Sequence, residues 1–141
     1  MNATVETKIW LALRERIESI PLDFTVIMPG QPTEAPFAYG ELEPFIRVGR
    51  ATADPSRIFI ANGMPHVRTG FLILTLAHPM GQNVSVYYQY AGIIADHFSD
   101  SKSMQYNDVC VTIPSYPTVS DGYEDNGYFN IPVRIPWRCS A

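Results

Sequence analysis

The chain opens with hydrophobic residues at helical spacing. They recur every four positions at Val5, Ile9, Leu13 and Ile17. This interval places the four side chains on one side of an α-helix, where they form an apolar stripe. Pro21 ends the predicted helix near residue 19, because the residue before a proline disfavours helical backbone.

A second helical pattern begins after Gly81, at about Asn83, and runs to His97 or Phe98. Its hydrophobic positions again recur at intervals of three and four, which is typical of a helix with one buried face. These positions are Val84, Tyr87, Tyr88, Ala91, Ile94, Ala95 and Phe98.

Short apolar or alternating runs predict strands between and after the helices. The run Val67 to Ala77 is apolar on both faces, which is typical of a central strand covered on both sides. The other predicted strands are Phe24–Met28, Phe45–Arg50, Arg57–Ile60, Val109–Ile113 and Tyr128–Trp137. This order predicts one α+β domain over residues 1–141, with a mixed, mostly antiparallel sheet of about five strands and two helices packed on one face.

Two prolines mark the last predicted strand as unusual. Pro132 and Pro136 are an even number of residues apart, so their missing N–H donors all belong to the same side of the strand. Because prolines in sheets are confined to edges, strand starts and bulges, we expect this strand to be an edge, paired through its odd-numbered residues.

The two predicted helices leave one face of the sheet without cover. Several hundred Å² of exposed apolar surface would be costly and prone to aggregation. Either the long loops or another subunit therefore has to shield that face.

Two long irregular segments separate the elements, at residues 31–44 and 115–127. Loops of this length are uncommon in compact domains and are usually functional or order on binding. The first contains Phe37 and Tyr39, and the second contains Tyr116 and Tyr123. These rings either tuck onto the body of the domain or dock on a neighbour.

Charge and composition narrow the function classes. Ten basic against fourteen acidic residues give a net charge of −4, and 17% of residues are charged, where about 25% is usual. The acidic balance excludes a generic basic nucleic-acid binder. Arginine outnumbers lysine by eight to two, and aromatic residues are plentiful, which is typical of protein interfaces.

The sequence offers no recognisable catalytic motif. The histidines His66, His78 and His97 lack the spacing of zinc ligands, and the glycines match neither phosphate-binding pattern. The cysteines Cys110 and Cys139 form no C-x-x-C pair, and we expect two reduced thiols. We therefore expect no enzyme, no cofactor and no metal.

The sequence also shows no signal peptide and no stretch long enough to span a membrane. The first eight residues are mostly polar, so we expect no signal peptide. The longest apolar stretch, Phe71 to Ala77, is far shorter than the ~20 residues that span a bilayer. We expect a soluble protein made in the cytosol, with no membrane partner.

Four stretches together resemble a known family. They are Arg57–Ile60 with Asn62-Gly63 and Pro65-His66, Gly70–Leu76 running into His78–Gly81, Ile94–Phe98, and Gly127–Val133. In order and spacing the chain is similar to bacteriophage tail terminator-like (tail completion) proteins of lambda-type long-tailed phages, from Thr4 to Trp137.

The resemblance implies a structural virion protein. It implies a homo-oligomeric ring, a hexamer, that caps the head-proximal end of the tail tube, stops tube polymerisation and joins the head–tail connector. Partners would be the tube protein and a connector or neck protein, and DNA would pass through without specific binding. The candidate assembly residues are Phe37, Tyr39, Arg47, Arg50, Arg57, Tyr116 and Tyr123.

The acidic residues of the two loops suggest a channel wall. Carboxylates facing the DNA would prevent sticking, because phosphate affinity comes from Lys and Arg contacts. The candidate channel-lining acids are Glu34, Glu41, Glu43, Asp121, Glu124 and Asp125.

Three other functions remain open from the sequence. One is another head–tail joining or neck protein of the virion. A second is a small metal-dependent hydrolase using His66, His78 and Asp96. The third is a monomeric binding module. If the chain is a tail terminator, we expect it in the host cytoplasm during assembly and then in the virion, at the head-proximal end of the tail.

Overall fold

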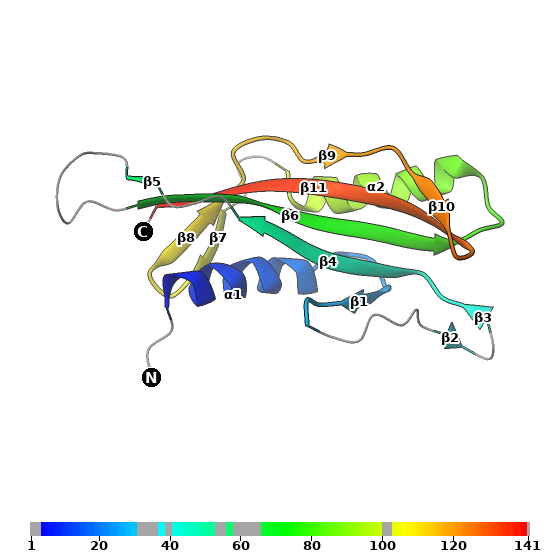
Figure 1. The fold of residues 1–141 in the computed structure, drawn as a ribbon, viewed down its shortest axis with the longest axis horizontal. Helices are drawn as coiled ribbons and strands as arrows, with labels where there is room; N and C mark the ends of the chain where they lie inside the picture. The colour runs from blue at the N-terminus through cyan, green and yellow to red at the C-terminus, as the bar shows by residue number, and fades with distance from the viewer. Residues whose placement is uncertain are drawn as a thin grey trace.

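The computed structural model describes residues 4–30, 37–38, 41–52, 56–57, 66–99 and 103–140. Within them two helices, α1 (Val5–Glu18) and α2 (Val84–His97), combine with short and long strands (Figure 1). Both helices match the sequence prediction to within one or two residues. The strands are β1 (Thr25–Ile27), β2 (Phe37–Ala38), β3 (Glu41–Leu42), β4 (Phe45–Thr52), β5 (Ser56–Arg57), β6 (His66–Pro79), β7 (Ser103–Tyr106), β8 (Val109–Thr112), β9 (Thr118–Val119), β10 (Tyr123–Asp125) and β11 (Tyr128–Ser140).

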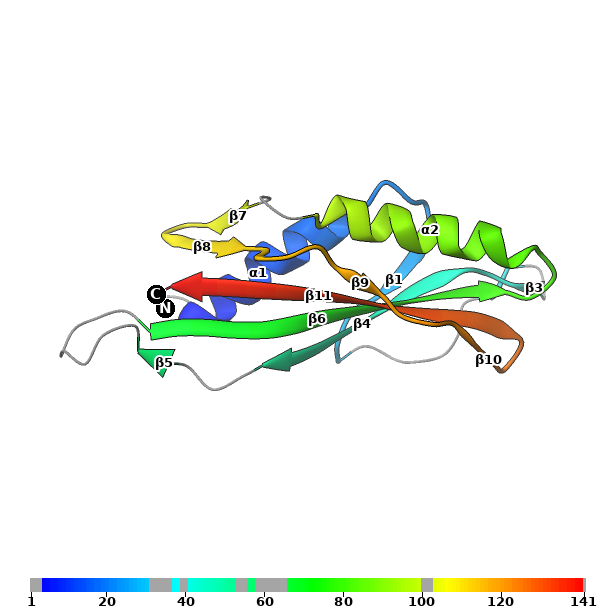
Figure 2. The ribbon, with the colours of Figure 1, turned by 90° about the horizontal axis from the view of Figure 1, so that it is seen from above.

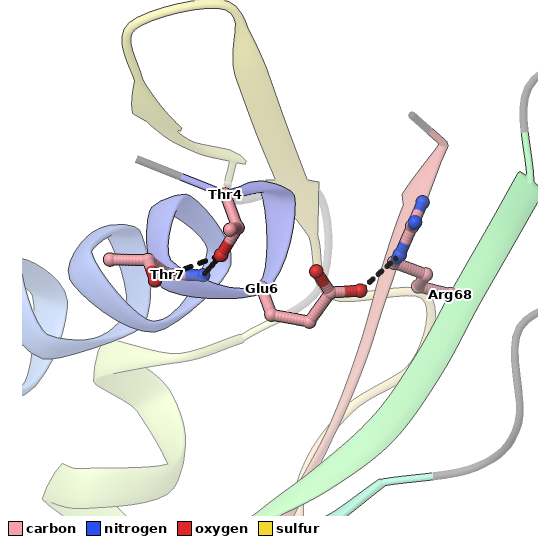
Figure 3. Close-up of polar contacts among 4 residues, drawn as sticks. All are labelled: Thr4, Glu6, Thr7 and Arg68. Carbon is pink, nitrogen blue, oxygen red and sulfur yellow. Dashed lines mark hydrogen bonds and ion pairs between the residues drawn. The ribbon is translucent and has the colours of Figure 1, made fainter. Parts of the chain in front are cut away.

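Capping and one ion pair fix the start of α1. The Thr4 hydroxyl accepts a hydrogen bond from the backbone N–H of Thr7 at 3.2 Å, which satisfies one free donor of the first turn (Figure 3). Two residues into the helix, Glu6 Oε1 accepts from Arg68 Nε of β6 at 3.0 Å. The helix is thereby tied to the sheet at its first turn.

The main sheet has the strand order β1-β4-β6-β11-β8-β7. Three further short strands pair at its sides, β5 with β6, and β9 and β10 with β11, which makes nine strands in this sheet. The β1–β4 pair is parallel and the others are antiparallel, so the sheet is mixed and mostly antiparallel as predicted. It exceeds the expected five strands mainly because β9 and β10 are too short to show an alternating pattern and because β7 has a single buried residue, Met104. A separate hairpin joins β2 and β3.

The long pair β6 and β11 forms the middle of the sheet. Its register runs from Tyr128 opposite Pro79 to Ser140 opposite Val67. β4 lies along the other side of β6, from Phe45 opposite Ala77 to Thr52 opposite Gly70. The prediction that the strand around residues 67–77 is central is confirmed.

The prediction that the last strand is an edge is wrong, because β11 has partners on both sides. One side pairs with β6, and the other pairs in pieces with β10, β9 and β8. The backbone N–H of Ser120 donates to Pro132 O at 2.9 Å, so the even-numbered residues of β11 face the interrupted side. Pro132 and Pro136 fall in the gaps between the three pieces, where no ladder donor is required.

Both helices cover the same face of the sheet (Figure 2). Their buried side chains belong to one core cluster with alternate residues of β6 and β11. The cluster includes Leu13 and Ile17 of α1, Ala91 and Ile94 of α2, Leu72, Leu74 and Leu76 of β6, and Ile131, Val133 and Ile135 of β11, all at most 1% exposed. The α+β class with two helices on one face is confirmed.

The opposite face of the sheet carries no helix among the described residues. A small second cluster of Ile27, Phe45, Ala77 and Tyr128, with Leu42 of β3 against it, covers one end of this face. Further along, Phe71 and Ile73 of β6 are only half-buried. The described part of the chain therefore leaves the middle of this face partly open.

Candidate assembly surfaces

The helix-free face of the sheet is positively charged. Its strands place Arg47 opposite Thr75, Arg134 opposite Ile73 and Arg138 opposite Thr69, and all three arginines are exposed. The strands β4, β6 and β11 contain no acidic residue. We call the surface formed by Arg47, Arg134, Arg138, Phe71 and Ile73 the arginine face.

Aromatic rings hold two of these guanidinium groups. The ζ carbon of Arg134 lies 3.8 Å from the centroid of the Phe71 ring, and that of Arg47 lies 5.4 Å from the centroid of Phe45. An arginine stacked on a ring is preorganised and still presents its N–H donors at the edge of the plane. The arginine face can therefore bind carboxylates with little loss of side-chain entropy.

A second surface carries the opposite charge. Asp121, Glu124 and Asp125 are exposed, and Tyr123 between them is 52% exposed. No lysine or arginine occurs between residues 109 and 133. We call residues 121–125 the acidic segment.

The fold holds the acidic segment firmly in place. The Tyr88 hydroxyl of α2 accepts a hydrogen bond from the backbone N–H of Gly122 at 2.9 Å. A Cβ atom at Gly122 would lie 2.3 Å from the Phe129 ring, so only glycine fits this approach. Asn126 and Gly127 then turn the chain into β11 with φ angles of 51° and 81°, as a tight hairpin turn requires.

The strands β3 and β10, one from each predicted loop, lie at the same end of the sheet (Figure 1). The Tyr128 hydroxyl donates to Glu43 O at 3.1 Å, and Tyr128 is also the register partner of Asp125. Burial, with the nearby Glu43 charge, raises the pKa of Tyr128 above its ordinary value. The exposed apolar side chains Met80 and Val84 also belong to this end, where the backbone N–H of Met80 donates to Gly127 O at 3.0 Å.

Tyr116 is exposed, as a contact residue would be, but its hydroxyl is occupied. It donates to Asp96 Oδ1 near the end of α2, and this hydrogen bond raises the pKa of Tyr116. The ring is 51% exposed and remains a candidate assembly residue.

Arg50 lies on the other face of the sheet from Arg47. Its ζ carbon is 5.4 Å from the Trp10 ring of α1 and 5.8 Å from the Trp137 ring of β11. Desolvation lowers the pKa of Arg50 below its ordinary value. Arg50 is exposed beside these two rings and remains a candidate assembly residue.

Several candidate residues lie outside the part of the chain that can be described in full. Glu34 and Tyr39 are outside the described residues. For Phe37 of β2, Glu41 of β3 and Arg57 of β5 only the backbone is described.

The histidines with described side chains have local structural partners. His78 is 8% exposed, with Nδ1 3.0 Å from Pro79 O and its ring stacked on Tyr90. His97 Nε2 lies 2.9 Å from Arg16 O. Asp96 follows Tyr90 by six residues, about 9 Å along a helix, so the described residues do not join Asp96 to His78 in one site.

No group of three or more metal-ligating side chains occurs among the described residues. A cavity of about 250 Å³ between α1 and β7 is smaller than typical ligand pockets. Cys139 is buried and Cys110 is exposed, and both thiols are free. No helix in the described ranges has the length and hydropathy needed to cross a membrane.

Sequence reasoning missed Arg134 and Arg138. The alternation of the last strand already placed both on its polar side, four residues apart. That signal becomes informative once β11 is known to lie beside β6, because the two arginines then share a face with Phe71 and Ile73.

Comparison with known proteins gives one family and one fold. The family model described as phage tail terminator protein matches residues 8–137. No curated protein matches the sequence. One solved structure, 14% identical in sequence, covers 93% of this chain and 92% of its own with a TM-score of 0.72, which shows that the two share a fold.

Proposed function

We propose, since the chain belongs to the phage tail terminator family, that it forms a ring capping the head-proximal end of the tail tube. A structural role in a phage tail follows from the family itself. The ring would stop polymerisation of the tube and offer the surface that joins the head connector. We propose six copies in the ring and no catalytic activity.

One observation in the fold carries the ring proposal. The described residues leave the middle of the helix-free face partly open, with Phe71 and Ile73 half-buried beneath exposed arginines. Apolar side chains beneath charged groups on a rigid sheet are suited to burial against another protein. A subunit that is completed by its neighbours fits this surface better than a monomeric binding module does.

The proposed partners follow from the position of the ring. It would contact the tube protein on one side and a connector or neck protein on the other, and DNA would pass through it without specific binding. We place the protein in the host cytoplasm during assembly and at the head-proximal end of the tail in the virion.

We propose that Glu34, Glu41 and Glu43 line the channel through the ring. Glu43, the one whose side chain is described, lies beside Tyr128 at the acidic end of the sheet. Asp121, Glu124 and Asp125 have an alternative role to lining the channel, because they could bind the arginine face of a neighbouring copy.

Deletion of the gene from the phage or prophage that encodes the chain tests the terminator role. We expect tails of abnormal, variable length without heads by electron microscopy, and normal particles when the wild-type gene is supplied on a plasmid. Tails of uniform length that lack only the head would indicate a neck protein. Normal, head-attached tails in the deletion would falsify both.

A further inference from the structure

We propose that the arginine face of one copy binds the acidic segment of a second copy. This inference rests on the proposed ring and adds which two surfaces of the subunit meet. It gives Asp121, Glu124 and Asp125 a contact with the neighbour in place of the channel wall.

The separation of charge along the chain supports this pairing. Three exposed arginines occupy a face whose long strands β4, β6 and β11 contain no acid, and three exposed acids occupy a segment without any lysine or arginine nearby in sequence. The two surfaces of one copy therefore carry the opposite charges that an interface between two copies requires. Complementary potentials of this kind set the register of an interface and exclude wrong pairings.

Both surfaces also supply apolar contact area. Tyr123 projects from the acidic segment with 52% of its surface exposed, and Phe71 and Ile73 lie half-buried under the arginines. Tyrosine and arginine are enriched among the residues that contribute most to binding. Burial of Tyr123 against Phe71 or Ile73 would exclude water from the surrounding ion pairs.

The two surfaces lie at different positions on the subunit, as a head-to-tail contact requires. Arg134 lies at the middle of the sheet, opposite Ile73, whereas Glu124 lies in β10 at the end of the sheet, opposite Phe129. A contact between two different surfaces repeats from copy to copy, and it closes into a ring when the rotation permits.

Charge reversal tests the pairing in a reciprocal way. Arg134→Glu lowers the charge of the arginine face from +3 to +1, and Glu124→Arg reduces the charge of the acidic segment from −3 to −1. Each variant therefore weakens the attraction and brings like charges together where residues 134 and 124 of two copies meet. We expect self-association of each to weaken on the order of 100-fold or more, because like charges meet at the contact. Mixed one to one, the two reversed positions oppose each other with opposite charges across one contact, and the unchanged Arg134 and Glu124 meet across the next. We therefore expect association to return as an alternating ring.

The decisive readout is complementation of the gene deletion. We expect neither variant alone to restore tails, and both supplied together to restore them. Light scattering and negative-stain images of the purified variants and their mixture provide the matching measurement in solution.

Two controls change the same charge away from the contact. Arg14→Glu and Glu15→Arg alter exposed positions of α1 and should leave assembly intact. Because Arg134→Glu also loses the Phe71 stacking, Arg138→Glu provides a second reversal on the arginine face without a ring contact among the described residues. Circular dichroism and urea unfolding confirm that each variant is folded.

Three outcomes would overturn the pairing. They are full activity of either reversal alone, failure of the mixture to recover, and rings that form normally but no longer bind tubes, which would assign the arginine face to the tube protein.

If the deletion itself yields normal tails, the terminator role fails, and the pairing is then judged by chemical cross-linking of the purified variants. In that case, cross-linking that is absent from each variant and present in the mixture supports the pairing, and any other pattern overturns it.

Discussion

The guanidinium of Arg134 lies flat against Phe71, with its ζ carbon 3.8 Å from the ring centroid. The two residues come from adjacent strands, because Arg134 is opposite Ile73 and Phe71 is the next residue of β6 on the same face. The ring shields one side of the cation, and the cation covers part of an apolar side chain that no described helix covers. This pair gives the helix-free face its mixed basic and aromatic character.

The first prediction concerns the strength of this stacking. Arg134→Ala should lower the free energy of unfolding by about 0.5–1 kcal/mol, the range for a cation–π contact at an exposed site. A double-mutant cycle with Phe71→Leu, measured by urea unfolding, isolates the pair energy. Arg138→Ala serves as the control on the same face, and a coupling energy near zero would contradict the prediction.

The second prediction concerns the cap of α1. Thr4→Ala removes the acceptor for the Thr7 N–H and should cost about 1 kcal/mol of unfolding free energy. Thr4→Ser and Thr4→Asp retain an oxygen acceptor and should stay within a few tenths of a kcal/mol of wild type. Equal losses for all three variants in urea unfolding would show that the hydroxyl does not act as a cap.

The third prediction concerns Arg50 between the two tryptophans of the chain. Arg50→Ala should destabilise the protein by about 1–2 kcal/mol, because it removes a partly desolvated cation–π contact and the packing of the arginine stem. Since Trp10 and Trp137 are the only tryptophans, the intrinsic fluorescence of the folded state should also change. Arg47→Ala, near Phe45 on the other face, should leave the fluorescence unchanged.

The fourth prediction concerns stability at acid pH. Hydrogen bonding from its own backbone N–H and then from Arg68 lowers the pKa of Glu6 below its ordinary value. A lowered folded-state pKa stabilises the protein above the unfolded pKa, and the contribution is lost as pH falls through the folded pKa. Because the Glu6 side chain is 66% exposed, we expect about 0.5 kcal/mol or less.

Glu6→Gln should therefore be less stable than wild type at pH 6 and should approach it below about pH 3. Urea midpoints across this range provide the measurement. Glu15→Gln, which removes one exposed charge from the same helix, is the control. A difference between Glu6→Gln and wild type that does not shrink towards low pH would contradict the assignment.

The local elements of this protein could be predicted because their signals are local. The stripe from Val5 to Ile17 and the repeat from Val84 to Phe98 extend over several turns, and both became helices with most of the predicted face buried, Val84 being exposed. The apolar character of residues 67–77 likewise indicated a central strand. In contrast, β9 and β10 contain two and three residues, too few for an alternating pattern, and their segment was predicted only as a loop.

The prolines of β11 show where such reasoning stops. Pro132 and Pro136 correctly indicated one side of the strand without regular pairing. They could not reveal that three short strands from residues 109–125 pair with β11 before, between and after the two prolines. That arrangement depends on where a distant segment returns to the sheet, which no nearby residue encodes.

The sequence by itself determined both helices, the central strand, the α+β class and the resemblance to tail terminators, because periodicity and turn residues act over a few positions. Only the tertiary structure decided which charges share a surface. Strand register placed Arg47, Arg134 and Arg138 together on one face, and the β10–β11 hairpin placed the acidic segment at the end of the same sheet. Such groupings arise from pairing between residues far apart in the chain, and they require the folded sheet to exist.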